Sequence, residues 1–179
     1  MKEIRTDRLL LRPFRADQAD LLGRVIRDRR VFFWREARVT EEEIQAVLNR
    51  SLDLAPQGMG WFTIHTRDDF RFVGDIVLQP LAESGDIEIG YHLLPESWGN
   101  GFATEAAEAM LDYGFRVLRL PEIVAVVLPD NTRSQRVIER LGLPYIEDRI
   151  HADLLHRYYA LSRTDYLAAR KTALEQPGS

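Results

Sequence analysis

The chain has 179 residues, of which 45% are hydrophobic and 29% charged, with a formal net charge of −4 and no cysteine. This length predicts one domain with a full hydrophobic core, and the lack of cysteine excludes disulfides, thiolate metal sites and an acyl-cysteine intermediate. The negative charge argues against nucleic acid or an anionic membrane as a partner. No apolar run is long enough for a membrane span, and the N-terminus lacks the apolar core of a signal peptide. We therefore expect a cytoplasmic protein that acts on a small or cationic group.

The N-terminal part predicts a strand followed by two helices. The strand at residues 8–12 is short and apolar and ends at a proline, and apolar residues then recur at helical spacing over residues 15–26. An aromatic link at residues 31–34 leads to Thr40 and Glu43, whose spacing is that of a capping box at the start of the second helix.

Three strands are predicted next, at residues 61–64, 71–78 and 87–93. The third alternates between apolar and other residues along its length. Because side chains alternate across a strand, Glu88 and His92 are expected on the same side of it, opposite the apolar residues.

A glycine-rich loop joins this strand to the next helix. The loop, residues 98–104 (WGNGFAT), passes directly into a helix pattern over residues 103–118. A strand that runs through glycines into a helix start gathers backbone N–H groups and the positive end of the helix dipole in one place, which suits a phosphate or pyrophosphate. The segment lacks the P-loop lysine pattern, and Thr104 stands where the third glycine of a dinucleotide-binding loop would lie.

The C-terminal part predicts a strand, a helix and two last strands. The strand at residues 122–128 reads as buried, and the helix begins after residues 129–132 and is closed by Gly142. The last strands are predicted at residues 145–149 and 154–161. No repeat or linker interrupts this order, which is that of a mixed α/β domain.

Three separated motifs resemble the GNAT N-acetyltransferases. The loop is similar to that family's acetyl-CoA pyrophosphate loop, Q/R-x-x-G-x-G/A, with Gly101 and Ala103 at the matching positions and Trp98 in place of the leading Gln or Arg. Residues 6–13 (TDRLLLRP) and 131–142 (NTRSQRVIERLG) also resemble the branch that includes the ribosomal-protein N-terminal acetyltransferases, the RimJ/RimL-like proteins.

The resemblance implies a fold and a reaction. The fold is the α/β (mixed, α+β-like) GNAT acyl-CoA N-acyltransferase fold, with a central mixed, mostly antiparallel sheet flanked by helices. We expect one such domain over residues 1–174 and a disordered tail at residues 175–179. The reaction uses acetyl-CoA as cosubstrate and no metal, and an amine attacks the thioester directly.

Ten residues are implied to bind acetyl-CoA, and three to bind the acceptor amine. The acetyl-CoA set is Leu93, Trp98, Gly99, Asn100, Gly101, Phe102, Ala103, Thr104, Asn131 and Ser134. The acceptor set is Trp34, Trp61 and His92.

Two residues are expected to be catalytic. Glu88 is the first candidate for the base, directly or through a water, although a strand glutamate is often only solvated or salt-bridged. Ser134 is expected to donate a hydrogen bond to the developing thiolate. In many GNAT enzymes a tyrosine acid lies four residues further on, where this chain has Ile138, which cannot donate a proton.

Several other side chains allow two interpretations. His92 has the right pKa range for proton transfer, but a polar residue hydrogen-bonded at the strand end is the simpler interpretation. Asn131 can cap its helix as well as bind the pantetheine arm. Arginines around Trp34 could hold an acidic acceptor or the CoA 3′-phosphate, or merely be solvated. Glu105 would repel a pyrophosphate, so we expect it to turn aside and cap or pair with an arginine. The four histidines match no metal-ligand spacing.

Two functions from different classes remain open. The first is an acetyl-CoA-dependent N-acetyltransferase acting on a protein N-terminus or a small amine, and the overall acidity mildly favours a cationic acceptor. The second is a catalytically idle CoA-binding module that serves as a sensor or assembly part. A homodimer formed through an edge strand is a further prediction.

Overall fold

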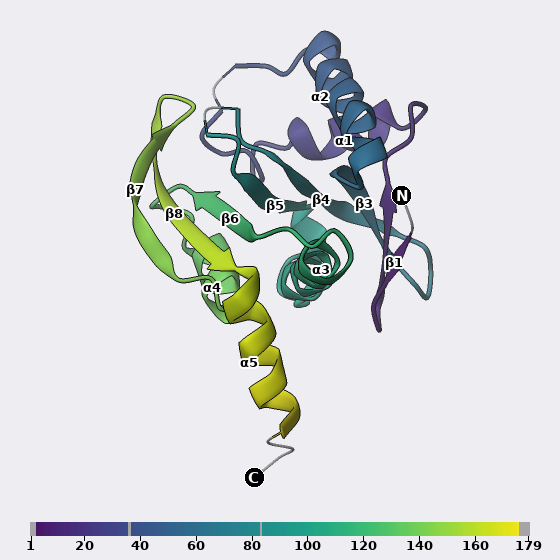
Figure 1. Ribbon diagram of the computed structural model, residues 1–179. Coiled ribbons are helices and arrows are strands. Elements are labelled where there is room, and N and C mark those ends of the chain that lie inside the picture. Colours follow the sequence, from purple (N-terminus) through teal and green to yellow (C-terminus); the bar gives the residue numbers. More distant parts are fainter. Residues whose placement is uncertain (1–2, 36, 83, 176–179) are drawn as a thin grey trace. The chain divides into compact units, whose positions relative to one another are not determined.

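The structure is a computed structural model that describes residues 3–35, 37–82 and 84–175. The chain divides into two compact units. Figure 1 shows its helices and strands, coloured along the sequence. The first contains Met1–Gln79 and Gly90–Met110, and the second contains Pro80–Ile89 and Leu111–Ser179. Strand β5 (Ile87–Leu93) and helix α3 (Phe102–Asp112) therefore each have residues in both units.

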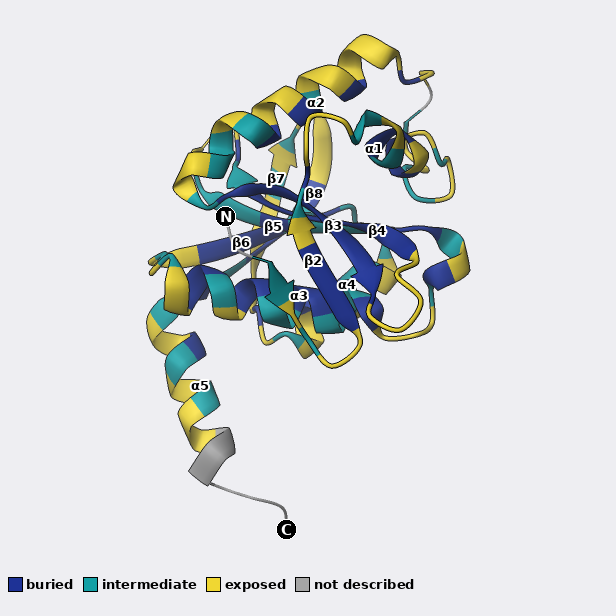
Figure 2. Cartoon of the chain, turned by 90° about the vertical axis from the view of Figure 1, so that its right-hand side faces the viewer, coloured by how far each residue is buried: buried dark blue, intermediate teal, exposed yellow. Residues whose placement is uncertain are grey.

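The first unit is a sheet with helices on both sides. Its strands lie in the order β1 (Ile4–Arg5), β2 (Leu9–Pro13), β3 (Gly60–Thr66), β4 (Phe72–Pro80) and the second half of β5. The three neighbouring pairs from β1 to β4 are antiparallel. Helices α1 (Ala19–Ile26) and α2 (Glu41–Leu54) lie on one side of these strands, and α3 lies on the other (Figure 2). Because both sides are covered, every residue of β3 is buried.

Helices α1 and α2 are fixed to the sheet by a shared apolar cluster. The cluster consists of Phe14, Leu22, Ile26, Val39, Ile44, Leu48, Trp61 and Val77. At the start of α2, the Thr40 hydroxyl accepts a hydrogen bond from the Glu43 N–H, and the Glu43 carboxylate accepts one from the Thr40 N–H. The predicted capping box is therefore confirmed, and it fixes the residue at which α2 begins.

The second unit continues the strand order as β5, β6 (Glu122–Val127), β8 (Leu154–Ser162) and β7 (Tyr145–His151). Strands β5 and β6 are parallel, with Glu88 opposite Val124, whereas β6, β8 and β7 pair antiparallel. Helix α4 (Thr132–Arg140) follows β6, and α5 (Arg163–Glu175) follows β8.

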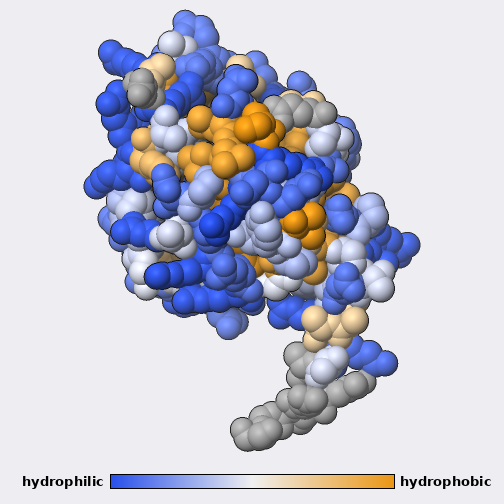
Figure 3. All heavy atoms as spheres, turned by 90° about the vertical axis from the view of Figure 1, so that its left-hand side faces the viewer, coloured by the Kyte–Doolittle hydropathy of each residue, from blue (hydrophilic) through white to orange (hydrophobic). Residues whose placement is uncertain are grey.

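Strand β7 is the outermost strand of the second unit. The hairpin of β7 and β8 has five exposed large apolar side chains, which are Tyr145, Ile146, Ile150, Leu154 and Leu155. Figure 3 views the molecule from the side on which β7 lies and shows apolar side chains gathered among polar ones on this face.

The structure confirms the predicted mixed α/β class and all eleven predicted elements, with shifted ends. Among the described residues it adds one strand and one α-helix, besides short 3-10 turns at Ala55–Gln57 and Pro95–Ser97. The missed elements are β1 and α5. The helix predicted over residues 103–118 changes at Tyr113–Val117 into a π-helical turn. Helix α5 ends at Glu175, the first residue of the predicted tail, and residues 176–179 lie outside the described residues. Among the described helices, none combines the length and apolar character needed to cross a bilayer.

Candidate functional site

The glycine-rich loop follows β5 and has a defined shape. Gly99 and Gly101 have φ angles of 78° and 77°, in the left-handed region that favours glycine. The Asn100 side-chain amide donates hydrogen bonds to the carbonyls of Ser97 and Trp98, both at 3.1 Å. A Cβ atom built at Gly99 would meet nothing within 4 Å, so the space in front of this residue is open.

Helix α3 begins at Phe102, within the last residues of the loop segment. The Glu105 N–H donates to the Gly101 carbonyl at 3.1 Å, which closes the first helical turn. The N–H groups of Phe102, Ala103 and Thr104 therefore lie at the helix start, where an α-helix has no internal acceptors for them and its dipole is positive. A preformed glycine loop before such a helix start suits a pyrophosphate group.

Trp98 and Leu93 fix the loop to the end of β5. The Trp98 indole Nε1 donates to the Leu93 carbonyl at 2.8 Å, and the Leu93 side chain is buried. Trp98, which stands in place of the leading Gln or Arg of the family pattern, thus joins the first loop residue to the strand.

Glu105 is paired with an arginine, as expected. Its carboxylate accepts hydrogen bonds from the Thr6 hydroxyl and from the N–H and Nε of Arg8, the last at 2.7 Å. Burial raises the pKa of Glu105, but the bonds from Thr6 and Arg8 and the charge of Arg8 outweigh that effect, so the pKa is lowered. Arg8 also donates to the Asn100 carbonyl at 3.0 Å and lies over the Phe102 ring. The negative charge next to the loop is therefore balanced by an arginine.

His92 lies in an aromatic cluster with two of the predicted acceptor residues. Its ring is stacked with Trp61, with centroids 5.5 Å apart, and with Phe32, with centroids 4.7 Å apart. Trp34 contacts Phe32 at 5.2 Å between ring centroids, and 38% of Trp34 is exposed. The structure thus brings Trp34, Trp61 and His92 together through Phe32, which the sequence analysis had not singled out as a site residue.

Asp75 is a second residue that the sequence analysis missed. It lies in the middle of β4, is completely buried, and its Oδ1 is 2.8 Å from Nδ1 of His92. Burial raises the pKa of Asp75, while the charge and hydrogen bond of His92 oppose this rise. The available signal was an acidic residue in an otherwise apolar strand, F-V-G-D-I-V-L.

Two of the arginines that flank Trp34 in the sequence, Arg35 and Arg38, line a cavity of about 320 Å³. Its lining residues are Ile26, Arg27, Arg29, Phe32, Arg35, Ala37, Arg38 and Val39. Four of these eight are arginines, and two of the four, Arg27 and Arg35, form ion pairs with Glu41 and Glu43.

The second unit contains the other predicted site residues. Asn131 is the N-cap of α4, and its Oδ1 accepts a hydrogen bond from the Ser134 N–H at 3.2 Å. Ile138, which occupies the position of the tyrosine acid found in many GNAT enzymes, is a buried core residue. Glu88 is half-buried on β5, opposite Val124 of β6.

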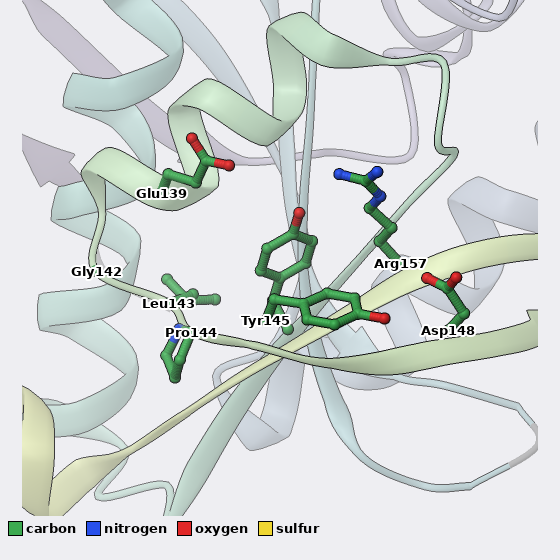
Figure 4. A pocket seen from close by; sticks show the side chains of 8 residues that line it. Glu139, Gly142, Leu143, Pro144, Tyr145, Asp148 and Arg157 are labelled. Carbon is green, nitrogen blue, oxygen red and sulfur yellow. The ribbon is translucent and has the colours of Figure 1, made fainter.

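A cavity of about 630 Å³ in the second unit contains none of the predicted site residues. It is lined by Glu139, Gly142, Leu143, Pro144, Tyr145, Asp148, Arg157 and Tyr159. Figure 4 shows Glu139 of α4 and the side chains of Tyr145, Asp148 and Arg157 around it. Among the described residues, no group of three or more His, Asp or Glu side chains could hold a metal ion.

Comparisons with known proteins bear on both units. Residues 8–144 match the model of the acetyltransferase (GNAT) domain family. The uncharacterised N-acetyltransferase YnaD of Bacillus subtilis is 32% identical over 142 residues, which are 78% of this chain and 81% of that protein. The spermidine N(1)-acetyltransferase of Escherichia coli K12 is 31% identical over 124 residues, covering 61% of this chain and 67% of that protein.

Solved structures show the same fold. A GNAT-family acetyltransferase from Bacillus anthracis superposes with a TM-score of 0.76 and 28% identity over 91% of this chain and 99% of its own. The ribosomal L7/L12 acetyltransferase RimL, solved with coenzyme A, has a TM-score of 0.75 and 16% identity over 92% and 99%. The predicted fold is therefore confirmed.

Proposed function

Since this chain belongs to the GNAT acetyltransferase family and is thereby an acetyl-CoA-dependent N-acetyltransferase, we propose that it transfers acetyl directly to a primary amine, either a protein N-terminus or a small amine. The observation that carries the proposal is the open glycine loop at residues 98–104, fixed by hydrogen bonds and followed at once by α3. Residues 1–174 form the proposed catalytic domain, and a cytoplasmic location belongs to the same proposal.

The ten residues that the resemblance assigns to acetyl-CoA are proposed to hold it. The loop and the first turn of α3 would bind its pyrophosphate through backbone N–H groups. Leu93 and Asn131 would hydrogen-bond the pantetheine arm, and the Asn131 side chain can do so through its amide NH₂ while its oxygen caps α4. When bound, acetyl-CoA supplies an activated acyl group whose thiol is a good leaving group.

The amine nitrogen must lose protons during the reaction. Glu88 is proposed to take the proton released as the nitrogen bonds to the carbonyl carbon, directly or through a water. Ser134 is proposed to donate a hydrogen bond to the sulfur as the carbon–sulfur bond breaks. Because Ile138 cannot act as an acid, water would complete protonation of the thiolate.

The acceptor is proposed to bind at the aromatic cluster. Trp34 and Trp61 can attract a cationic amine through their ring faces, and His92 lies against Trp61. A relative named spermidine acetyltransferase and a structural neighbour named for a ribosomal protein leave both classes of amine in this proposal. The exposed apolar residues beside edge strand β7 support a proposed homodimer.

The test is calorimetric titration of acetyl-CoA, followed by measurement of free thiol when amines are added. We expect micromolar binding and thiol release that depends on a primary amine, such as a polyamine or a peptide with a free N-terminus. Binding without release from any amine would instead support the CoA-binding module. No binding at all would refute the assignment of the loop.

A further inference from the structure

The pair formed by Asp75 and His92 has a geometry that the proposed reaction does not yet use. The carboxylate lies on β4 and the imidazole on β5, and the bond between them is 2.8 Å. Asp75 is fully buried, and its second oxygen, Oδ2, has no hydrogen-bond partner among the described residues. A buried carboxylate with one oxygen unsatisfied is a costly arrangement.

A structural role alone does not account for this cost. Removing both polar groups from a buried pair and filling the space with apolar side chains is often neutral or stabilising. Strands β4 and β5 are neighbours in the sheet without the pair, and the Leu94 N–H, directly after β5, donates to the Val73 carbonyl of β4 at 2.9 Å. Costly titratable pairs of this kind are concentrated at functional sites.

The imidazole of His92 is held in one orientation. Trp61 and Phe32 lie against its ring with interplanar angles of 13° and 26°, so the ring cannot rotate freely. If Asp75 is ionised, it accepts a hydrogen bond from the Nδ1–H of a neutral His92. The available lone pair of the imidazole is then on Nε2. The side chain is 20% exposed, so it is not sealed in the core.

Charged side chains lie near the ring of His92. A proton accepted at Nε2 creates an imidazolium next to the Asp75 carboxylate. Phe32 and Trp61, the other partners of the ring, are uncharged. The cavity beside Phe32 is lined by Arg27, Arg29, Arg35 and Arg38, of which Arg27 and Arg35 are paired with Glu41 and Glu43.

We infer that His92, oriented by Asp75, is a general base that converts the ammonium form of the acceptor into the neutral amine. This inference rests on the proposed function. Two protons leave the nitrogen when R–NH₃⁺ becomes an amide. His92 takes the first at Nε2 before attack and returns it to solvent. The second leaves as the carbon–nitrogen bond forms, through Glu88 or water, and balances the thiolate released when the carbon–sulfur bond breaks.

The test is the pH dependence of kcat/KM in the full chain with a primary amine that the wild type acetylates. For His92→Gln we expect kcat/KM to fall about 100-fold at pH 7. The difference from wild type should shrink as the pH approaches the pKa of the amine, because the amine is then neutral in solution and needs no base to deprotonate it. Asp75→Asn should lower kcat/KM by a smaller factor, and its difference from wild type should shrink with rising pH in the same way. His65→Gln, which removes a buried histidine that stacks on Phe70, is the matched control and should stay within about 2-fold of wild type.

Two results would overturn the inference. A His92→Gln profile that runs parallel to wild type at every pH would show that the residue only shapes the site. In wild-type protein, ¹⁵N NMR of the imidazole should show the proton on Nδ1, and a proton on Nε2 would mean that Asp75 is the protonated partner. Wild type that binds acetyl-CoA but acetylates no amine would instead refute the proposed function, while the NMR result would still decide the tautomer.

Discussion

Gly99 and Gly101 owe their role in the loop to backbone conformation and not to lack of space. A Cβ at Gly101 would come no closer than 3.5 Å to the Arg8 guanidinium, an ordinary contact, and one at Gly99 would meet nothing. Both residues nevertheless have positive φ angles, which cost other residues about 1–2 kcal/mol. Substitutions here therefore separate the effect of strain from the effect of the new side chain.

We expect Gly101→Glu to weaken acetyl-CoA binding at least tenfold, about 1.4 kcal/mol, because it puts a carboxylate where the pyrophosphate would bind. Gly142→Glu is the matched control, since Gly142 has a φ of 79° and an open Cβ position. Both variants should lose similar thermal stability, measured by calorimetric unfolding, and only the first should lose affinity. Equal affinities would contradict the loop assignment.

At the scale of elements, the Arg8–Glu105 ion pair joins the start of β2 to the first turn of α3. The Glu105 carboxylate accepts two hydrogen bonds from Arg8 and one from Thr6. The Glu105 side chain is 17% exposed, and the Arg8 side chain is 53% exposed. Exposure of the arginine limits the contribution to about 1 kcal/mol. The pair also orders Asn100 through its carbonyl, so it supports the loop as well as the helix.

Glu105→Gln should destabilise the protein by about 1 kcal/mol at neutral pH. The folded-state pKa of Glu105 is lowered, so its contribution is fully present above the unfolded value of about 4.3 and is lost as the pH falls through the folded pKa. Urea unfolding of variant and wild type should therefore differ near pH 7 and converge in acid, as the pH falls through the folded-state pKa of Glu105. Glu139→Gln, an exposed glutamate of α4, controls for loss of a surface charge. A difference that persists in acid would contradict the assigned pairing.

Local signals in the sequence were enough for most elements. The capping box at Thr40 and the alternation of residues 87–93 each depend on neighbours within a few positions, and both predictions are confirmed. Helix α5 was missed because its apolar stripe is weak, and Tyr166 is its one large buried side chain among the described residues. Its start had a signal, since the Ser162 hydroxyl accepts from the Asp165 N–H.

The Asp75–His92 pair could not be read from spacing. The two residues are 17 positions apart on neighbouring strands, and only the alignment of β4 with β5 brings them together. The stacking of His92 between Phe32 and Trp61 depends in addition on how the aromatic link folds over the sheet. The sequence therefore predicts His92 as a site residue without its partner Asp75.

At the scale of the whole molecule, the predicted ligand-binding residues are divided between the two units. Loop residues 98–104 belong to the first unit, whereas Asn131 and Ser134 belong to the second. A ligand that binds the folded state alone stabilises it by mass action. The thermal stability of the chain is therefore a measure of binding that requires no acceptor.

We expect acetyl-CoA at 100 times its Kd to stabilise the fold by about 2.7 kcal/mol. For a chain of this size that corresponds to a rise in Tm of about 5–10 °C, measured by scanning calorimetry. Gly101→Glu should show a much smaller rise at the same ligand concentration. An unchanged Tm in wild type would contradict binding to the native state.

The ion pair between Arg8 and Glu105 joins positions that are 97 residues apart in the chain. A change at one of them leaves an uncompensated charge beside the glycine loop unless the other changes too. Across related proteins, positions 8 and 105 should therefore vary together, as should positions 75 and 92. Evolution can exchange these residues in pairs more readily than one at a time.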